Sequence, residues 1–307
     1  MKKIFWHLRF WLFFTKCKLG ALTGKRDLDP LYWDEQEKTR INYYCKLDAP
    51  FSLNESITPF DITLTKSTGY SYDMFRIMEG MDKRIRFAAL YGDVIHVPHQ
   101  PTFVKSRPIA APNKNSVLLP LDTNRHLVFL TDKHSHQEKI SKIVWRGAAY
   151  RENRKKFLAA VTGLDFCDVR DTSRNAEGGT KANWLTKEQQ LKYKFIFSIE
   201  GNDVATNLKW IMSSNSLCFM PKPNYETWFL EGTLIPDYHY VCIKNDFSNI
   251  KEKYDFYLAN PGKAQEIINH AQQFVNQFRD INRQFELAKE VVSKYQLFIS
   301  KSDSSSE

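Results

Sequence analysis

The chain has 307 residues, of which 42% are hydrophobic and 26% are charged. These values are typical of globular proteins and exclude a broadly disordered or collagen-like chain. The length suggests two domains of ordinary size or one large domain. Because 44 basic residues outnumber 35 acidic ones, the formal net charge is +9, a value that also fits a basic nucleic-acid-binding protein.

Most of this charge lies at the N-terminus. Residues 1–26 contain seven Lys and Arg residues and no acid, so they carry +7 of the total. Their longest uninterrupted apolar run, Phe10–Phe14, has five residues, whereas a membrane-spanning helix needs about 20. His7 and Arg9 also interrupt the apolar centre that a signal peptide requires. We therefore expect a basic aromatic helix over 1–26, which either lies on an anionic membrane surface or packs on the protein's own core.

Cysteine and histidine patterns give no sign of a metal or disulfide framework. The five cysteines are scattered without a C-x-x-C pair, which favours free thiols in a reducing compartment. Two histidine pairs, at 96 and 99 and at 134 and 136, lack a third ligand at a fixed spacing. Asp27-Leu-Asp29 has the D-x-D form of metal-dependent sugar transfer, but it follows no apolar strand, so we interpret it as a loop. We predict no metal site and no cofactor.

From Asp29 to Asp132 the pattern predicts strands joined by long loops. Short apolar runs such as Ile85–Leu90 and Val117–Leu121 are separated by polar stretches that contain proline. Asp93 follows Gly92 just after the first of these runs. A carboxylate at a strand end could act as a general base, although an ordinary turn residue is the alternative.

From Ser141 onward, strands and helices alternate. The predicted strands are Lys142–Trp145, Phe195–Ile199, Ser216–Met220 and Tyr238–Ile243, and the predicted helices are Arg151–Val161 and Val204–Ser213. This alternation indicates βαβ units and a parallel sheet. After Pro261, apolar residues at three- and four-residue steps predict one long helix. The polar tail, residues 301–307, is expected to be disordered.

A basic cluster at 139–156 could hold a diphosphate. Arg146-Gly147 follows a predicted strand and precedes a helix, so a guanidinium and backbone N–H groups are expected together there. Arg151 begins the helix, whereas Lys155 and Lys156 fit a solvated helix face.

A second candidate site follows the strand that ends at Ile199. Gly201 would allow a ligand to approach the backbone, and short polar side chains follow it at Asn202, Asp203, Thr206 and Asn207. Asp203 is the expected N-cap of the next helix. Neither G-x-G-x-x-G nor a Walker A motif is present. The alternative is an ordinary capped helix.

The C-terminal half resembles glycosyltransferase family 90. The resemblance spans residues 85–280 and is strongest after 140. It rests on the joint pattern of Trp145-Arg146-Gly147, K-Y-K-F at 192–195, L-K-W at 208–210, S-N-S at 214–216, Trp228-Phe229 and I-P-D-Y-H-Y at 235–240. The sequences E-G-N-D at 200–203 and E-T-W at 226–228 are similar to those of the bacterial lipopolysaccharide branch of the family.

The resemblance implies an α/β fold of the GT-B type, in which two Rossmann-like domains face each other across a cleft. We expect a basic aromatic helix at 1–26, an acceptor-side domain at 27–136 and a nucleotide-sugar-binding domain at 137–300. The long C-terminal helix falls within this last range, and the alternative is that the last helix packs back on the first domain, as GT-B chains often do. The resemblance also implies inverting transfer without a required metal.

The family's site residues are carried over by position. Asp93 matches the catalytic base, although the motif here is Tyr-Gly-Asp rather than the Arg-Asp-Tyr of eukaryotic members. Arg146 matches the diphosphate arginine, and a second arginine of eukaryotic members is replaced by Asn207. Glu226 or Glu231 could bind donor hydroxyls, or each could pair with a neighbouring cation.

The expected function is transfer of glucose or galactose from a UDP-sugar to a core sugar of lipopolysaccharide or lipooligosaccharide. Such an enzyme would work in the cytoplasm, at the inner face of the inner membrane, with residues 1–26 as its membrane contact. It would have no nucleic-acid partner. The alternatives are a nucleic-acid-binding protein and a glycosyltransferase that acts on a protein or capsule acceptor.

Overall fold

The computed structural model describes residues 32–300 except 63–67, 83, 111, 175 and 177–181. The predicted helix at 1–26, the D-x-D segment and the tail at 301–307 lie outside the described residues. The chain divides into unit 1, which contains residues 1–124 and 280–307, and unit 2, which contains residues 125–279. The sequence predicts a division at 136–137 and a last helix that either belongs to the second domain or packs back on the first. In the structure the chain returns to unit 1 at Asp280.

In the described part of the chain, unit 1 combines a small parallel sheet with helices that precede and follow it. Its elements are α2 (Glu35–Tyr44), η1 (Pro59–Asp61), α3 (Thr68–Met78), β1 (Ala89–Leu90), β2 (Thr102–Val104), β3 (Ser106–Pro108), β4 (Ser116–Leu118) and α11 (Ile281–Leu297). The sheet order is β1-β2-β4, with Ala89 opposite Phe103 and Phe103 opposite Val117. The Tyr295 ring of α11 packs 4.4 Å from that of Phe103, and its hydroxyl donates to Pro101 O at 2.8 Å. The last helix is thus anchored in the core of this unit.

Unit 2 is built on a parallel sheet of five strands. After α4 (Thr123–His126), which spans the division, come η2 (His136–Glu138), β5 (Ile140–Gly147), α5 (Glu152–Val161), β6 (Cys167–Asp171), α7 (Lys187–Gln190), β7 (Tyr193–Phe197), α8 (Leu208–Met212), β8 (Leu217–Met220), β9 (Tyr225–Thr227), η3 (Glu231–Thr233), β10 (Val241–Cys242), α9 (Ile250–Ala259) and α10 (Pro261–Asn276). The sheet order is β10-β8-β7-β5-β6, and every pair is parallel. The predicted parallel α/β architecture is confirmed for this unit.

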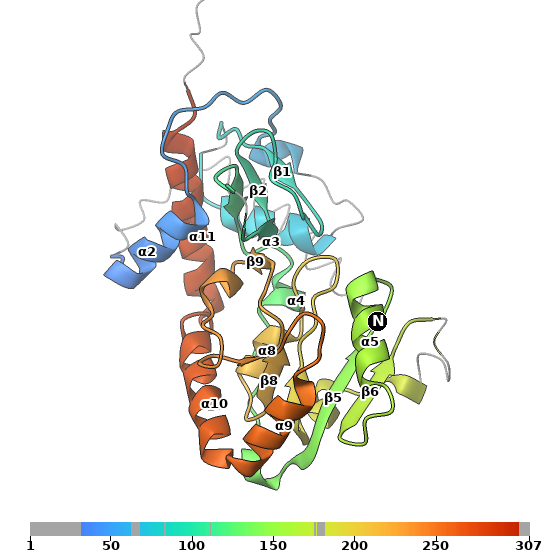
Figure 1. Ribbon diagram of the computed structural model, residues 1–307. Coiled ribbons are helices and arrows are strands. Elements are labelled where there is room, and N and C mark those ends of the chain that lie inside the picture. The colour runs from blue at the N-terminus through green and yellow to red at the C-terminus, as the bar shows by residue number, and fades with distance from the viewer. Residues whose placement is uncertain are drawn as a thin grey trace, which may run out of the picture. The chain divides into compact units, whose positions relative to one another are not determined.

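One face of this sheet carries the main apolar core of unit 2. Trp145 of β5, Phe157 of α5, Phe195 of β7 and Tyr254 of α9 belong to one buried cluster, and Figure 1 shows α5 beside β5 and β6. The rings of Trp145 and Phe157 meet edge to face at 5.3 Å. Burial of such aromatic side chains stabilises this layer, because each removes a large apolar surface from water.

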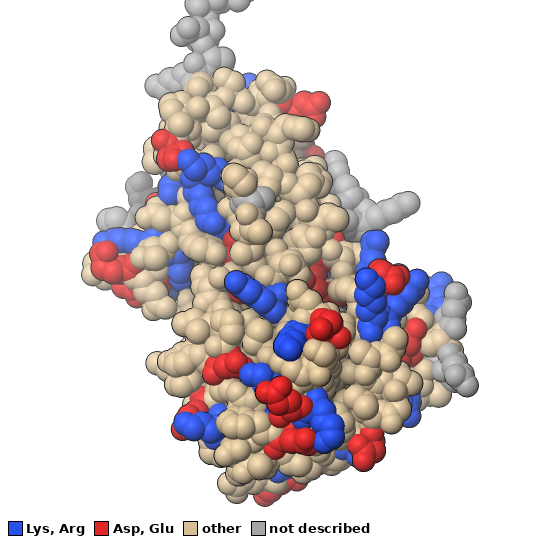
Figure 2. Space-filling view, in the orientation of Figure 1, with Lys and Arg blue, Asp and Glu red and all other residues tan. Residues whose placement is uncertain are grey.

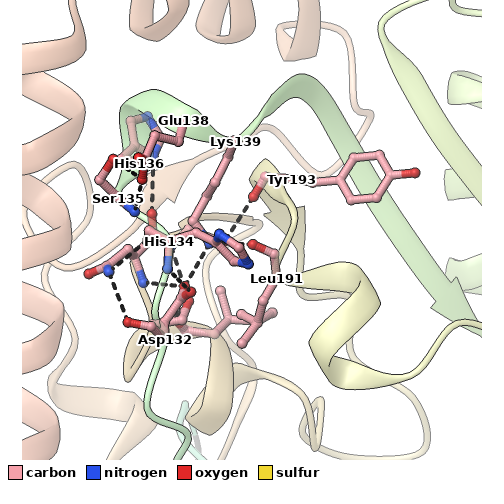
Figure 3. Close-up of polar contacts among 12 residues, drawn as sticks. Asp132, His134, Ser135, His136, Glu138, Lys139, Leu191 and Tyr193 are labelled. Atoms are coloured by element: carbon pink, nitrogen blue, oxygen red, sulfur yellow. Dashed lines mark hydrogen bonds and ion pairs between the residues drawn. The ribbon is translucent and has the colours of Figure 1, made fainter.

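A buried ion pair fastens the amino ends of the strands (Figure 3). Lys139, just before β5, donates to Asp132 Oδ2 at 2.6 Å, and both side chains are almost fully buried. The same ammonium donates to Leu191 O, just before β7, and to Ser216 Oγ, just before β8. Three strand starts are therefore joined through one side chain, at the edge away from the candidate site.

The predicted long C-terminal helix is wrong in one respect, because the structure breaks it between Asn276 and Ile281. Asp280 caps the second helix by accepting from the backbone N–H groups of Asn282 and Arg283, both at 3.0 Å. The apolar periodicity continues across the break because Phe278 is buried as well. The apolar periodicity therefore does not indicate the point at which the chain passes from one unit to the other.

Candidate functional site

The strand order of unit 2 places a switch point between β5 and β7. The strand that follows β5 in the chain, β6, lies on one side of it, and β7 lies on the other. Connections from two such strands leave the sheet in opposite directions, which opens a crevice at their carboxyl ends where ligands of α/β proteins bind. The two segments that the sequence singled out, 146–151 and 201–207, follow these two strands.

Three side chains at the start of α5 bond to residues that follow β7. Arg151 Nε donates to Asn202 Oδ1, and Asn153 Nδ2 donates to Glu200 O at 2.7 Å. Arg154 donates from Nη2 to Ile199 O at 2.8 Å and from Nη1 to Ala148 O at 3.1 Å. These bonds fix the start of α5 against the end of β7.

The Arg154 guanidinium lies directly over Gly201. A Cβ placed on Gly201 would lie 3.2 Å from Nη2 of Arg154, and the Trp145 ring lies on another side of the guanidinium, 5.6 Å from Cζ. Burial lowers the pKa of Arg154 from its usual value, which nevertheless leaves arginine charged near neutral pH. A fixed positive charge therefore stands at the carboxyl end of β7. We expected Gly201 to admit a ligand, whereas the structure uses its open side for this guanidinium.

A pocket of about 270 Å³ opens beside this arrangement. Its wall is made by the first turn of α5, the segment after β7, and the segment after β8. The residues that line it include Asn153, Lys156, Ser198, Glu200, Val204, Leu208, Pro221, Asn224, Tyr225, Glu231 and Phe247. Apolar surface with a few convergent polar groups is typical of small-molecule sites.

Glu200 connects two walls of the pocket. Its carboxylate accepts from Asn224 N at 2.9 Å, from Asn224 Nδ2 at 2.9 Å and from Tyr225 N at 3.2 Å. Burial raises the pKa of Glu200, and the hydrogen bonds from Asn224 and Tyr225 oppose that rise. The carboxylate thus holds the segment after β8 against the end of β7.

Arg146 lies on β5 but is engaged elsewhere. Its Nη2 donates to Asp168 Oδ1 at 2.7 Å and its Nη1 donates to Asp168 O at 2.7 Å. Burial alone would raise the pKa of Asp168, but hydrogen bonds from Tyr193 and Arg146 lower it below its usual value. The Arg146 side chain is only 9% exposed, and neither Arg146 nor Arg154 is among the residues that line the pocket. This placement differs from the predicted contact with a diphosphate.

Gly147 is explained by close packing. A Cβ there would lie 2.5 Å from Cζ2 of the Trp145 ring, a distance that no side chain could accept without movement of the indole. The glycine, the last residue of β5, therefore leaves room for the Trp145 ring, and Arg151 is the exposed N-cap residue of α5.

The predicted helix over 204–213 is wrong at its start. Residues 201–207 form bends and turns, and α8 begins only at Leu208, after Asn207 as its N-cap. Asn207 Nδ2 donates to Phe197 O at 2.9 Å, which ties the start of α8 to the end of β7. Asp203 is buried, and its backbone carbonyl accepts from Gly201 N at 3.1 Å, so it closes a turn. Thr206 lies half-buried in the same segment.

Glu226 and Glu231 are both fully buried. Glu231 forms an ion pair with the equally buried Lys209 of α8 and accepts from Thr227 N at 2.6 Å. The alternative that we kept open for Glu231, a salt bridge to a neighbouring cation, is thus what the structure shows. Glu231 also lines the pocket, whereas Glu226 lies within β9.

Asp93 lies in unit 1, three residues after the end of β1. Gly92 before it has φ +109°, a conformation that side-chain-bearing residues rarely adopt. The Asp93 carboxylate accepts from Lys105 Nζ at 2.5 Å and remains 29% exposed. Asp93 is thus a surface-accessible carboxylate with a defined cationic partner.

Sequence reasoning missed Arg154, Asn153 and Glu200 as site residues. Arg154 was one of seven cations in a cluster, and only the packing on Trp145 and Gly201 distinguishes it. Exposed cations of the cluster, Arg151, Lys155 and Lys156, belong to the start of α5, where Figure 2 shows basic side chains gathered. The sequence does offer one signal for Glu200, which is its position immediately before Gly201.

The described residues contain neither a cluster suited to a metal ion nor a helix suited to a membrane. No group of three or more His, Cys, Asp or Glu side chains in that part of the chain is arranged to hold a metal ion. No helix there combines the length and the apolar character that a membrane span requires.

Comparison with known proteins places the chain among sugar transferases. The sequence model described as "Glycosyl transferase family 90" matches residues 120–303. The chain is 41% identical to O-glucosyltransferase LpsA of Dichelobacter nodosus over 84% of its own length and 82% of that protein. It is 32% identical to human Protein O-glucosyltransferase 1 over 36% of its length and 28% of that protein. Asp93 lies before the residues that the family model matches.

Proposed function

The chain belongs to glycosyltransferase family 90, and from that premise we propose that it transfers glucose or galactose from a UDP-sugar to a core sugar of lipopolysaccharide or lipooligosaccharide. The observation that carries this proposal is the 41% identity to O-glucosyltransferase LpsA over most of both chains. The sequence E-G-N-D at 200–203, which resembles the bacterial lipopolysaccharide branch of the family, supports a lipopolysaccharide acceptor. We further propose the GT-B division of labour, in which unit 2 binds the donor and unit 1 supplies the base.

In the proposed reaction the acceptor hydroxyl oxygen attacks the anomeric carbon of the donor. The bond from that carbon to the diphosphate oxygen breaks, and its electron pair leaves with UDP. Asp93 takes the proton of the attacking hydroxyl. Attack opposite the leaving group inverts the configuration at the anomeric carbon.

We assign stabilisation of the departing diphosphate to Arg154, with Arg151 as a second cation. Arg154 stands at the switch point, and its guanidinium has five N–H groups. Its bonds to described residues leave one further N–H on each terminal nitrogen. A charged donor that is already held in place stabilises developing negative charge without reorganisation. We propose that this suffices without a required metal. Arg146 supports the same region through its pair with Asp168.

The pocket beside Arg154 is our candidate for the donor. Ser198, Asn224 and Asn153 provide hydrogen-bonding groups on its wall, and Val204, Pro221 and Phe247 provide apolar surface. This combination suits a nucleoside or hexose ring, which has polar edges and less polar faces.

The proposed setting is the cytoplasmic face of the inner membrane. Residues 1–26 carry seven cations among aromatic residues, a composition that favours an anionic lipid surface. Contact with the membrane would bring the enzyme to a lipid-anchored acceptor. A flotation assay with liposomes, comparing the full chain with one that lacks residues 1–26, tests this part.

The function itself is tested on the product in cells. Mass spectrometry of lipopolysaccharide from cells with and without the gene should differ by one hexose. Purified protein should then transfer hexose from UDP-glucose or UDP-galactose to the lipopolysaccharide of the deletion strain. Unchanged lipopolysaccharide would contradict the proposal, and transfer to a protein or capsule fraction instead would establish the alternative acceptor.

A further inference from the structure

Asp93 and its cationic partner come from adjacent strands of the unit 1 sheet. Leu90, the last residue of β1, pairs with Val104, the last residue of β2. Asp93 follows the first strand end and Lys105 follows the second, so both reach the same edge of the sheet. Their Oδ1 and Nζ atoms lie 2.5 Å apart.

The two partners differ sharply in exposure. The Lys105 side chain is 2% exposed, whereas that of Asp93 is 29% exposed. A buried ammonium is costly unless it is paired, so Lys105 depends on its acceptors. The pair therefore has a fixed inner end, the lysine, and an accessible outer end, the carboxylate.

Further groups surround the buried ammonium. Tyr70 of α3, which is itself buried, is hydrogen-bonded to Lys105, and the charge of Asp122 also acts on Tyr70. Burial raises the pKa of Tyr70 and the charge of Lys105 opposes that rise, so the tyrosine stays protonated at neutral pH. Asp73 of α3 accepts from Thr123 N at 2.7 Å, and the charge of Asp122 acts on it. Lys105 is thus held from α3, through Tyr70, and from the end of β1, through Asp93.

We propose that Lys105 is the positioning residue of the catalytic base: it orients the Asp93 carboxylate toward the acceptor hydroxyl and favours its ionised form. This inference rests on the proposed function, because it assumes that Asp93 accepts the proton. A neighbouring cation stabilises a carboxylate, and a buried one cannot be displaced by solvent as a surface lysine can. Lys105 does not itself touch the reacting atoms.

The test compares Lys105→Met with Lys105→Arg in the full-length protein. For Lys105→Met we expect kcat to fall about 100-fold, the size of effect that misplacement of a reacting group by about 1 Å produces, while the Kd for UDP is unchanged. The acidic limb of the pH–rate profile should move to higher pH, because the carboxylate has lost the cation that favours its ionised form. Lys105→Arg, which keeps the charge, should restore most of the wild-type profile.

Matched controls separate this role from a general effect. Lys114→Met removes the partner of Asp48, an exposed pair in the same unit, and should leave kcat and the pH profile unchanged. Burial raises the pKa of Asp73 to about 7. The Asp73→Asn variant therefore shows how much of the pH profile arises from titration of that residue. If Lys105→Met fails to fold, Lys105→Gln serves instead, since it also removes the cation but keeps a polar end, and it should shift the acidic limb in the same direction.

The outcomes distinguish the two proposals. If Asp93→Asn is inactive while Lys105→Met, or Lys105→Gln in its place, keeps the wild-type kcat and pH profile, Lys105 is not a positioning residue and the proposed base stands. If Asp93→Asn retains full activity, the base is assigned wrongly and the inference about Lys105 is overturned with it.

Discussion

The guanidinium of Arg154 occupies the space that a side chain at residue 201 would fill. A Cβ on Gly201 would lie 3.2 Å from Nη2 and 3.4 Å from Cζ of Arg154. The arginine reaches this position from α5, whereas the glycine follows β7, so the contact bridges the switch point of the unit 2 sheet. The absence of a side chain at residue 201 therefore fixes where the positive charge stands.

Substitution of Gly201 by alanine should displace that charge. The added Cβ is closer than most such contacts, so the guanidinium must shift and lose part of its bonding to Ile199 O. We expect UDP affinity to fall by up to about tenfold, equivalent to about 1.4 kcal/mol, as measured by isothermal titration calorimetry. Gly262→Ala is the matched control, because a Cβ at Gly262 meets nothing within 4 Å. Unchanged affinity in Gly201→Ala would show that the charge is not used by the nucleotide.

Substitution by methionine should lower UDP affinity at Arg154 and the free energy of unfolding at Arg146. Arg154→Met removes a charge-assisted contact to the diphosphate, so UDP affinity should fall at least tenfold, as expected for a loss of about 1.5–3 kcal/mol. Arg146→Met leaves Asp168 without its cation, so the free energy of unfolding should fall by about 2 kcal/mol while UDP affinity changes little. Calorimetry and urea unfolding of both variants measure the two effects. Loss of UDP binding in Arg146→Met with a normal Arg154→Met would return the diphosphate to Arg146.

The sequence predicts the sheet of unit 2 well because its strands are short apolar runs that end at Gly, Pro or polar residues. The predicted strand at 142–145 corresponds to β5, and that at 216–220 corresponds to β8. The helix at 204–213 was misjudged because an Asp before an apolar run resembles an N-cap. In the structure, Asn207 takes that position instead and bonds back to Phe197 O.

The site was only partly predictable because local sequence does not determine the order of the strands in a sheet. Gly201 could be placed after a strand, but nothing local says that β7 lies beside β5 rather than β6. Likewise the seven cations of 139–156 look equivalent until Trp145, Gly201 and Asp168 select a different role for each arginine. Lys105 lies between the two apolar runs that the sequence singled out, so nothing local indicated its burial.

The buried pair of Lys209 and Glu231 should be strongly coupled. Both side chains are excluded from solvent, so Lys209→Met leaves an uncompensated carboxylate and should lower the free energy of unfolding by about 3–5 kcal/mol. Glu231→Gln keeps an oxygen that can accept from Thr227 N. The double variant should therefore be at least about 1 kcal/mol more stable than the sum of the two single effects predicts. A double-mutant cycle in urea measures this, and strict additivity would contradict the coupling.

His136 should make the protein sensitive to acid. Burial lowers the pKa of His136 to about 4, and a hydrogen bond with Asn215 O opposes that shift only in part. Because the folded-state value lies below the unfolded value of about 6.5, the contribution is fully present above pH 6.5 and is lost as the pH falls toward 4. The free energy of unfolding should thus decline over this interval by at most about 3 kcal/mol from this residue.

Replacement of the imidazole tests that dependence. In His136→Gln the side chain no longer titrates, so the decline between pH 6.5 and 4 should become shallower, even if the variant is less stable at pH 7. Urea unfolding at half-unit pH steps measures the slope. His134→Gln, which changes an exposed histidine of the same segment (Figure 3), should keep the wild-type slope. Equal slopes in wild type and His136→Gln would mean that the histidine at the amino ends of the strands is not kept neutral by folding.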